Sequence, residues 1–233
     1  MFESGTDAPL PSAVATLLGM SVDIAPPTAL ERNWWLRSAA VLVAPRAVFV
    51  SLRDDSDAAF DARSEPLTAV IGLAGIAGVL ATPVARTLLN DSSFSVSLIP
   101  VWAFFGGVVY ALTFYWLGGG LLFGAARRLG GLGSYRRARQ VIALSAVPLA
   151  LSLLTLWPVR IAIYGEDLFR TGGNDYGRGD NIFGALVDLS FVWCALLLVV
   201  GVRAVHGWTW ARSTATVALA AGFPVLIVLA TTI

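Results

Sequence analysis

The residues best suited to chemistry form a glycine-rich turn followed by a run of arginines. They are Gly130, Gly131, Gly133, Ser134, Arg136, Arg137 and Arg139. Glycines permit a tight reversal, and a serine can cap the free amide groups at the start of a helix. Helix N-termini and arginines also attract phosphate, but the Gly-Lys-Ser/Thr of a P-loop is absent. The favoured interpretation is a turn that sets membrane topology. Contact with anionic lipid headgroups comes second and nucleotide binding last.

Other groupings of reactive residues fail on geometry. Cys194 and His206 are twelve residues apart, about 18 Å along one helix, so they cannot form a thiolate–imidazole pair. Residues 177–180 match the GxGD pattern of intramembrane aspartyl proteases, but they fall in a polar loop, and Asp188 is the only acid inside an apolar stretch. The acidic loop 166–180 lacks EF-hand spacing, which favours a solvated loop. We therefore expect no enzymatic activity, no cofactor and no metal site.

The composition indicates whether the surface of the folded chain faces water or lipid. The chain is 57% hydrophobic and 13% charged, whereas soluble domains carry about 25% charged residues. A chain with so few charged residues cannot form a surface that is soluble in water, so its surface must face lipid. The net charge of +1 argues against nucleic-acid binding, which requires a strongly basic face. The single cysteine excludes an internal disulfide and a thiolate zinc cluster.

Long apolar stretches must position the turn. Five of them lie at 67–89, 99–123, 141–163, 183–205 and 214–233. Each approaches or exceeds the roughly 20 residues that a helix needs to cross a bilayer. Strands of a membrane barrel would be half as long and would alternate apolar with polar residues. In a soluble protein, the rest of so short a chain could not bury five such helices. The predicted fold is an all-α integral membrane protein with five transmembrane helices preceded by an interfacial amphipathic helix.

The arginines predict the orientation of these helices. Ten lie on one side of the predicted spans: Arg46, Arg53, Arg63, Arg127, Arg128, Arg136, Arg137, Arg139, Arg203 and Arg212. Four lie on the other side: Arg86, Arg160, Arg170 and Arg178. The positive-inside rule places the first group in the cytoplasm. We expect a multi-pass protein of the cell (inner) membrane, with its N-terminus cytoplasmic and its C-terminus outside.

The region before the first stretch divides into two parts. Residues 1–33 are predicted to be a mobile cytoplasmic tail, and residues 34–65 an interfacial helical segment ahead of a five-span domain at 66–233. Pro45 suits the first turn of a helix. From there Val48, Phe49 and Leu52 form an apolar face, which is typical of a helix lying in the membrane interface. A sixth span is the competing interpretation, but arginines and a proline interrupt the run.

Small residues recur within the stretches. They include Gly72, Gly75, Gly78, Gly120 and Gly124, and Pro148 can kink the third stretch. Small residues let helices approach closely. Packing inside one bundle is the favoured role, and the seam of a homo-oligomer is the alternative.

Two segments carry a resemblance. "VLVAPRAVFVSLRDD" precedes the first stretch, and "GGLGSYRRARQVIALSAVP" joins the second to the third. They resemble the opening signature and the glycine-rich cytoplasmic turn of the Yip domain, the Ypt/Rab-interacting family of membrane proteins. The resemblance implies a pre-span helix, five spans and a cytosolic N-terminus. Pro45, Arg46 and the glycine–arginine turn are the residues that we expect to contact lipid or a partner at the cytoplasmic face. Eukaryotic members of the family are associated with vesicle traffic and Rab-type GTPases. The all-arginine basic composition instead indicates the bacterial branch, where Rab proteins are not expected.

Two functions are therefore open. The first is a non-enzymatic Yip-like protein that organises the membrane or partner proteins at its cytoplasmic face. Its partners would be membrane lipids and a membrane or cytoplasmic protein of unknown identity. The second is a small transporter or permease subunit for an apolar or lipid-like substrate. A polar cavity reaching the bilayer midplane would favour the transporter, and a tightly packed bundle would favour the organiser.

Overall fold

The structure is a computed structural model that describes residues 34–54, 56–131, 133–175 and 177–232. In these stretches the regular structure is helical and no strand occurs. The described residues between Trp34 and Thr232 belong to one compact unit. The mobile tail predicted at 1–33 lies outside the described residues.

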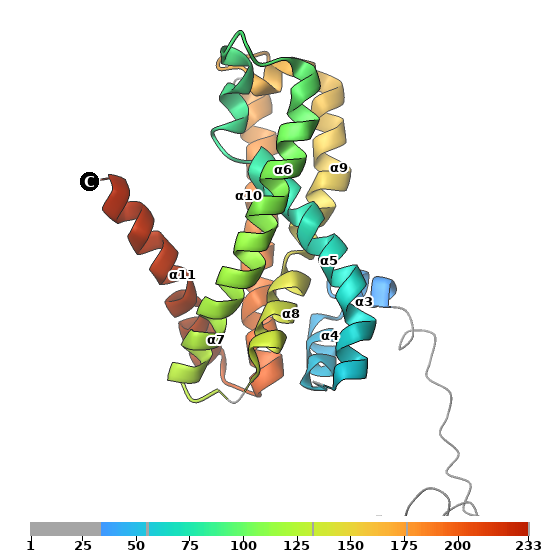
Figure 1. The fold of residues 1–233 in the computed structure, drawn as a ribbon, viewed down its shortest axis with the longest axis vertical. Coiled ribbons are helices and arrows are strands. Elements are labelled where there is room, and N and C mark those ends of the chain that lie inside the picture. Colours follow the sequence, from blue (N-terminus) through green and yellow to red (C-terminus); the bar gives the residue numbers. More distant parts are fainter. Residues whose placement is uncertain (1–33, 55, 132, 176, 233) are drawn as a thin grey trace, which may run out of the picture. The chain divides into compact units, whose positions relative to one another are not determined.

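Four helical segments are long and apolar enough to cross a membrane, which confirms the all-helical class. They are Asp57–Leu80, Val96–Arg128, Tyr135–Phe169 and Arg178–His206. Figure 1 shows the helices that form them running side by side. A polypeptide crosses lipid most readily as such helices, because each closes its own backbone hydrogen bonds.

The first span differs in its limits from the expected range 67–89. It is α5 (Asp57–Leu80), which begins about three turns earlier. Its start is determined by a cap, because Ser56 Oγ accepts a hydrogen bond from the Ala59 N–H at 3.3 Å. The last part of the expected range instead forms a short 3₁₀ helix, η2 (Ala85–Asn90). The predicted limit between residues 65 and 66 therefore falls inside one helix.

The second and third spans are interrupted in different ways. The second joins α6 (Ile99–Leu112) to α7 (Gly119–Arg128) through a π-helical turn. The third is divided at Ala146 into α8 (Tyr135–Ser145) and α9 (Val147–Tyr164). Pro148 explains the division, because it has no N–H to donate to the carbonyl four residues earlier.

The remaining helices complete the unit. The fourth span is α10 (Arg178–His206), which ends at Gly207 in the left-handed conformation, φ 68°. The last helix is α11 (Trp210–Thr232). It packs on α7 and α10, and its far end leans away from the others (Figure 1). It is not among the four segments above, so its crossing of the membrane stays a prediction.

The segment before the first span does not present its apolar face to lipid. It contains α3 (Trp34–Ala40), α4 (Pro45–Val50) and a 3₁₀ turn at Ser51–Arg53. The predicted face exists, but Val48, Phe49 and Leu52 are buried in the main hydrophobic core. That face packs against α10. The fourth span therefore covers the face that was expected to contact lipid, and periodicity alone cannot reveal such a protein partner. The position of the segment at the membrane interface stays a prediction.

Two of the small residues lie where helices touch. A Cβ added at Gly75 would come 2.7 Å from the Ala111 Cβ, and one added at Gly78 would come 2.6 Å from the Tyr110 ring. Both positions therefore bring α5 against α6. Gly72 and Gly124 would meet no heavy atom within 4 Å, and Gly120 only the Tyr135 ring at 3.9 Å.

This difference gives a matched pair of substitutions on one helix. Gly75→Leu is expected to destabilise the protein by about 1–3 kcal/mol or more, because the side chain must force α5 away from α6. Gly72→Leu should be nearly neutral, since its Cβ meets open space. Thermal unfolding in mild detergent measures both. Equal melting temperatures would show that the α5–α6 contact is not close.

Candidate functional site

The glycine turn joins two helices by local hydrogen bonds. After α7, Gly130 takes a positive φ of 79°, and the Gly131 N–H donates to the Ala126 carbonyl at 2.8 Å. This is the usual way a helix C-terminus is closed by glycine. Ser134 Oγ accepts a hydrogen bond from the Arg137 N–H at 3.1 Å and caps α8, which confirms the predicted cap.

The three arginines of α8 bind other parts of the chain. Arg136 Nη1 lies 2.7 Å from Asp57 Oδ1. Arg137 Nη2 donates to the Arg53 carbonyl at 2.9 Å. Arg139 lies over the Trp116 ring, 4.1 Å from its centroid, with Tyr115 and Tyr135 also within cation–π distance. These contacts tie α8 to the start of α5 and to the second span.

One arginine of α5 is fully buried, and its burial was not predicted from the sequence. Arg63 on α5 is 0% exposed, as is Gln140 on α8. Arg63 Nη1 donates to Gln140 Oε1 at 3.3 Å, its Nη2 to the Asp54 carbonyl at 2.6 Å, and its Nε to the Ala59 carbonyl. In the sequence Arg63 looks like one more orientation signal. Its spacing from Leu67 and Val70, four and seven residues on, was the available sign of an inward face.

Arginines also bind backbone carbonyls at the ends of α10 and α7. Arg53 donates from Nε and Nη2 to the Ala204 carbonyl at 3.0 and 2.7 Å. That carbonyl belongs to the last turn, where backbone acceptors lack helical partners. Arg212 donates to the Leu129 carbonyl and lies over the Trp208 ring at 4.1 Å. The turn at 129–134, the start of α5 and the end of α10 thus meet at one end of the bundle, which we call the basic end.

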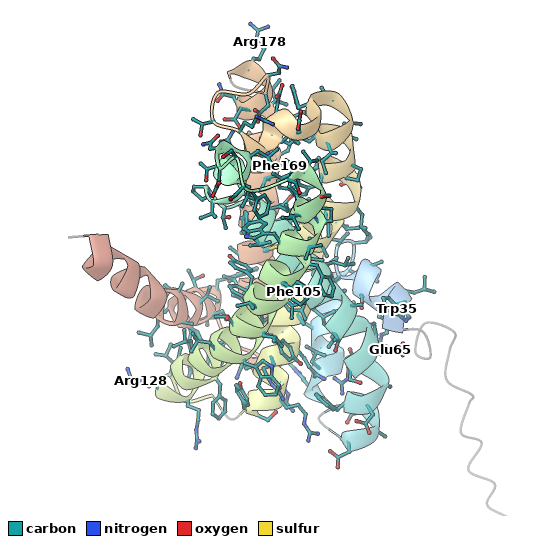
Figure 2. The ribbon with its side chains drawn as sticks, turned by 45° about the horizontal axis from the view of Figure 1, so that its top comes forward. Trp35, Glu65, Phe105, Arg128, Phe169 and Arg178 are labelled. Atoms are coloured by element: carbon teal, nitrogen blue, oxygen red, sulfur yellow. The ribbon has the colours of Figure 1, made fainter. Side chains whose placement is uncertain are left out.

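Three exposed arginines of the basic end make no hydrogen bond or ion pair within the described stretches. Arg46 lies on α4, and Arg127 and Arg128 lie in the last turn of α7. Within the described stretches, Arg46 and Arg128 form neither hydrogen bonds nor ion pairs, and Arg127 lies only over the Phe123 ring. We call these three residues the exposed arginines. Figure 2 shows Arg128 and Arg178 at opposite ends of the bundle.

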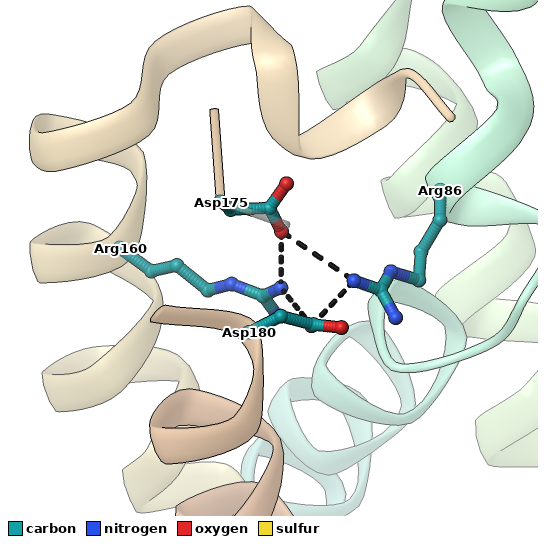
Figure 3. Close-up of polar contacts among 4 residues, drawn as sticks. All are labelled: Arg86, Arg160, Asp175 and Asp180. Atoms are coloured by element: carbon teal, nitrogen blue, oxygen red, sulfur yellow. Dashed lines mark hydrogen bonds and ion pairs between the residues drawn. The ribbon is translucent and has the colours of Figure 1, made fainter. Parts of the chain in front are cut away.

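The opposite end holds an ion cluster where a solvated acidic loop was expected. Arg160 Nη2 lies 2.8 Å from Asp175 Oδ2 and 3.2 Å from Asp180 Oδ1. Arg86 pairs with both carboxylates, at 3.5 Å from Asp175 (Figure 3). Asp175 is only 3% exposed, so the expectation is wrong there. The hydrogen bond to Asp180 raises the pKa of Arg86. The spacing of residues in the sequence does not predict this cluster, because its members come from three separate segments.

The sequence that forms this pre-span helix, the apolar spans and the capped glycine turn matches a known domain. The Yip1 domain matches residues 39–233. The chain belongs to the Yip1 domain family. Both segments that suggested the resemblance fall inside the match, and the protein is a multi-pass membrane protein. No curated protein and no solved structure is significantly similar to this Yip1 domain.

Proposed function

We propose that this Yip1 protein is a non-enzymatic membrane protein that organises lipids or partner proteins at its cytoplasmic face, and that the basic end is that face. One observation carries the proposal: the arginines of this end divide into two groups. Most of them form hydrogen bonds, ion pairs or ring contacts with distant parts of the chain, whereas Arg46, Arg127 and Arg128 are exposed and form no hydrogen bond or ion pair with the described residues. Exposed arginines beside a bilayer attract anionic headgroups by about 1 kcal/mol each.

The residues of the glycine turn support the contact with lipid or partner and do not themselves make most of it. Arg136, Arg137 and Arg139 hold α8 in place through their contacts. Gly130 and Gly131 shape the reversal, and Pro45 starts the helix that carries Arg46. The contact with lipid or partner therefore falls mainly to the exposed arginines, with the rest of the motif as their support.

Changing the exposed arginines should reduce anionic lipid bound to the protein. The triple variant with Arg46, Arg127 and Arg128 changed to Gln is expected to lose preference for anionic lipid by about fivefold per arginine, from roughly 1 kcal/mol each. Lipids retained in polymer-bounded native discs, quantified by mass spectrometry, give the measurement. The control changes Arg170 and Arg178, exposed at the opposite end, to Gln. Equal lipid composition in both variants would contradict the proposal.

The orientation that underlies the proposal has its own test. We infer five spans, with α11 as the fifth, an N-terminus in the cytoplasm and a C-terminus outside the cell (inner) membrane. A reporter active outside the membrane should be on when fused after residue 233 and off when fused at Ser134. The excess of arginine at the basic end supports this orientation. The opposite pair of results would reverse the proposed face, and two inactive fusions would leave α11 outside the bilayer.

A second function, a small transporter or permease subunit for an apolar or lipid-like substrate, is favoured only by the size of one cavity, which is not the polar cavity expected above of a transporter. A cavity of about 320 Å³ lies beside the division between α8 and α9. Its lining is largely apolar and includes Ile71, Ile142, Leu149, Cys194 and Val217. Movement of a fluorescent lipid analogue across proteoliposomes would identify this second function. A protein that moves no such analogue would leave the organiser as the function.

A further inference from the structure

An acidic side chain inside the fourth span has no partner. Asp188 lies on α10, ten residues after Arg178, which is about 15 Å along the helix. It is exposed and makes neither a hydrogen bond nor an ion pair with any part of the chain that the structure describes. A carboxylate at such a position is costly in hydrocarbon, and those that persist face a polar cavity or a ligand.

Asp188 borders such a cavity. The cavity has a volume of about 420 Å³ and lies at the end of the bundle that holds the ion cluster. Arg86, Arg160, Asp180 and Asn181 also line it. This volume is within the range of sites for small molecules.

The charged side chains at the cavity are not all paired with one another. The two guanidiniums of the ion cluster are matched by its two carboxylates, Asp175 and Asp180. Figure 3 shows these four side chains joined by their ion pairs. Asp188 is therefore the carboxylate of the cavity lining that pairs with neither guanidinium, and a bound cation would pair with it.

The other walls indicate what kind of cation fits. Trp157, Phe169 and Phe191 line the cavity with aromatic surface. Trp157 is 4% exposed, and its indole N–H is buried without a hydrogen-bond partner among the described atoms. Aromatic rings favour organic ammonium groups over small, strongly hydrated metal ions. The cavity also has too few carboxylates in reach to dehydrate a calcium ion, which takes six to eight oxygen ligands.

We propose that this cavity binds an organic ammonium ion, with Asp188 as its counter-ion and the aromatic walls around its apolar part. The ammonium belongs either to a soluble amine or to the headgroup of an aminophospholipid. The ion cluster holds the cavity open by fixing η2, the loop before α10 and the end of α9 to one another. This site is at the far end from the exposed arginines, so it is independent of the function proposed above.

The test measures binding of 2-phenylethylammonium to the purified full chain in the uncharged detergent dodecyl maltoside. Calorimetry should show saturable binding to the wild type and none of its neutral isostere, 2-phenylethanol. Asp188→Asn should bind at least about tenfold more weakly, because the ammonium loses its counter-ion. Glu166→Gln, which changes an exposed acid at the same end, is the control and should bind as the wild type does.

A second variant tests the need for the open cavity while Asp188 stays unchanged. Gly184 lines the cavity, and a Cβ added there would meet no heavy atom within 4 Å. Gly184→Leu should therefore fill the space and abolish binding while the protein keeps its melting temperature. Displacement of the amine by phosphatidylethanolamine, but not by phosphatidylglycerol, would identify a lipid headgroup as the ligand. Absence of displacement would identify a soluble amine. Failure of the wild type to bind, or equal binding by the wild type and Asp188→Asn, would overturn the proposal.

Discussion

Phe49→Asp is expected to detach α4 from the bundle and to lower the melting temperature in detergent by roughly 6–20 °C. The Phe49 ring is 0% exposed. Its Cε1 lies 3.0 Å from where a Cβ on Gly201 would be, so α10 receives the ring at a glycine. Truncating such a ring costs about 3–5 kcal/mol, and for a chain of this size each kcal/mol lowers the melting temperature by roughly 2–4 °C.

The same helix supplies the control for this prediction. Ala47→Asp places the identical charge on the exposed side of α4 and should leave the melting temperature almost unchanged. Both variants should still insert into the membrane, because the four spans are untouched. If the two variants unfold at the same temperature, the packing of α4 on α10 is not a source of stability.

Arg63→Met should destabilise the protein by about 3–5 kcal/mol, the usual cost of removing one member of a buried charged network. The substitution leaves the Asp54 carbonyl and Gln140 Oε1 without the donors they have now. Arg63→Lys should be nearly as harmful, because one ammonium cannot replace a planar fork that reaches three acceptors. Chemical unfolding in mixed micelles measures the free energy of each variant.

A double substitution tests whether Gln140 accounts for part of this loss. Adding Gln140→Leu to Arg63→Met removes the stranded acceptor, so the pair should be more stable than the sum of the single effects predicts. The control is Arg46→Met, an exposed arginine whose loss should be nearly neutral. Strict additivity of Arg63→Met and Gln140→Leu would show that the two side chains do not interact.

The parts of the fold that depend on local pattern were predictable. Hydropathy alone identified the helical class and the stretches that became the four spans. Ser134 followed by a helix predicted its cap, because capping requires only residues close in the chain. The two quoted segments indicated the family for the same reason.

The parts that depend on distant partners were not predictable. The apolar face of Phe49 was visible in the sequence, but the protein surface that covers it lies on α10. Arg63 was used only to predict the orientation of the spans, because no residue near it in the chain indicates its hydrogen bond with Gln140. Asp175 was expected in water, although Arg160 and Arg86 reach it from separate helical segments. Charge neutralisation of this kind appears only when the chain is folded.

The hydrogen bonds from Arg53 to Ala204 have a consequence for the order of assembly. The two residues are 151 positions apart. At a ribosome speed of roughly 5–20 residues per second, α4 leaves the ribosome about 8–30 s before its partner does. During that interval the apolar side of α4 has no place in the bundle, while three spans enter the membrane ahead of α10. Closure of α4 onto α10 is therefore a late step in biogenesis, and a truncated chain that lacks α10 displays the ring of Phe49 to the quality-control machinery of the cell.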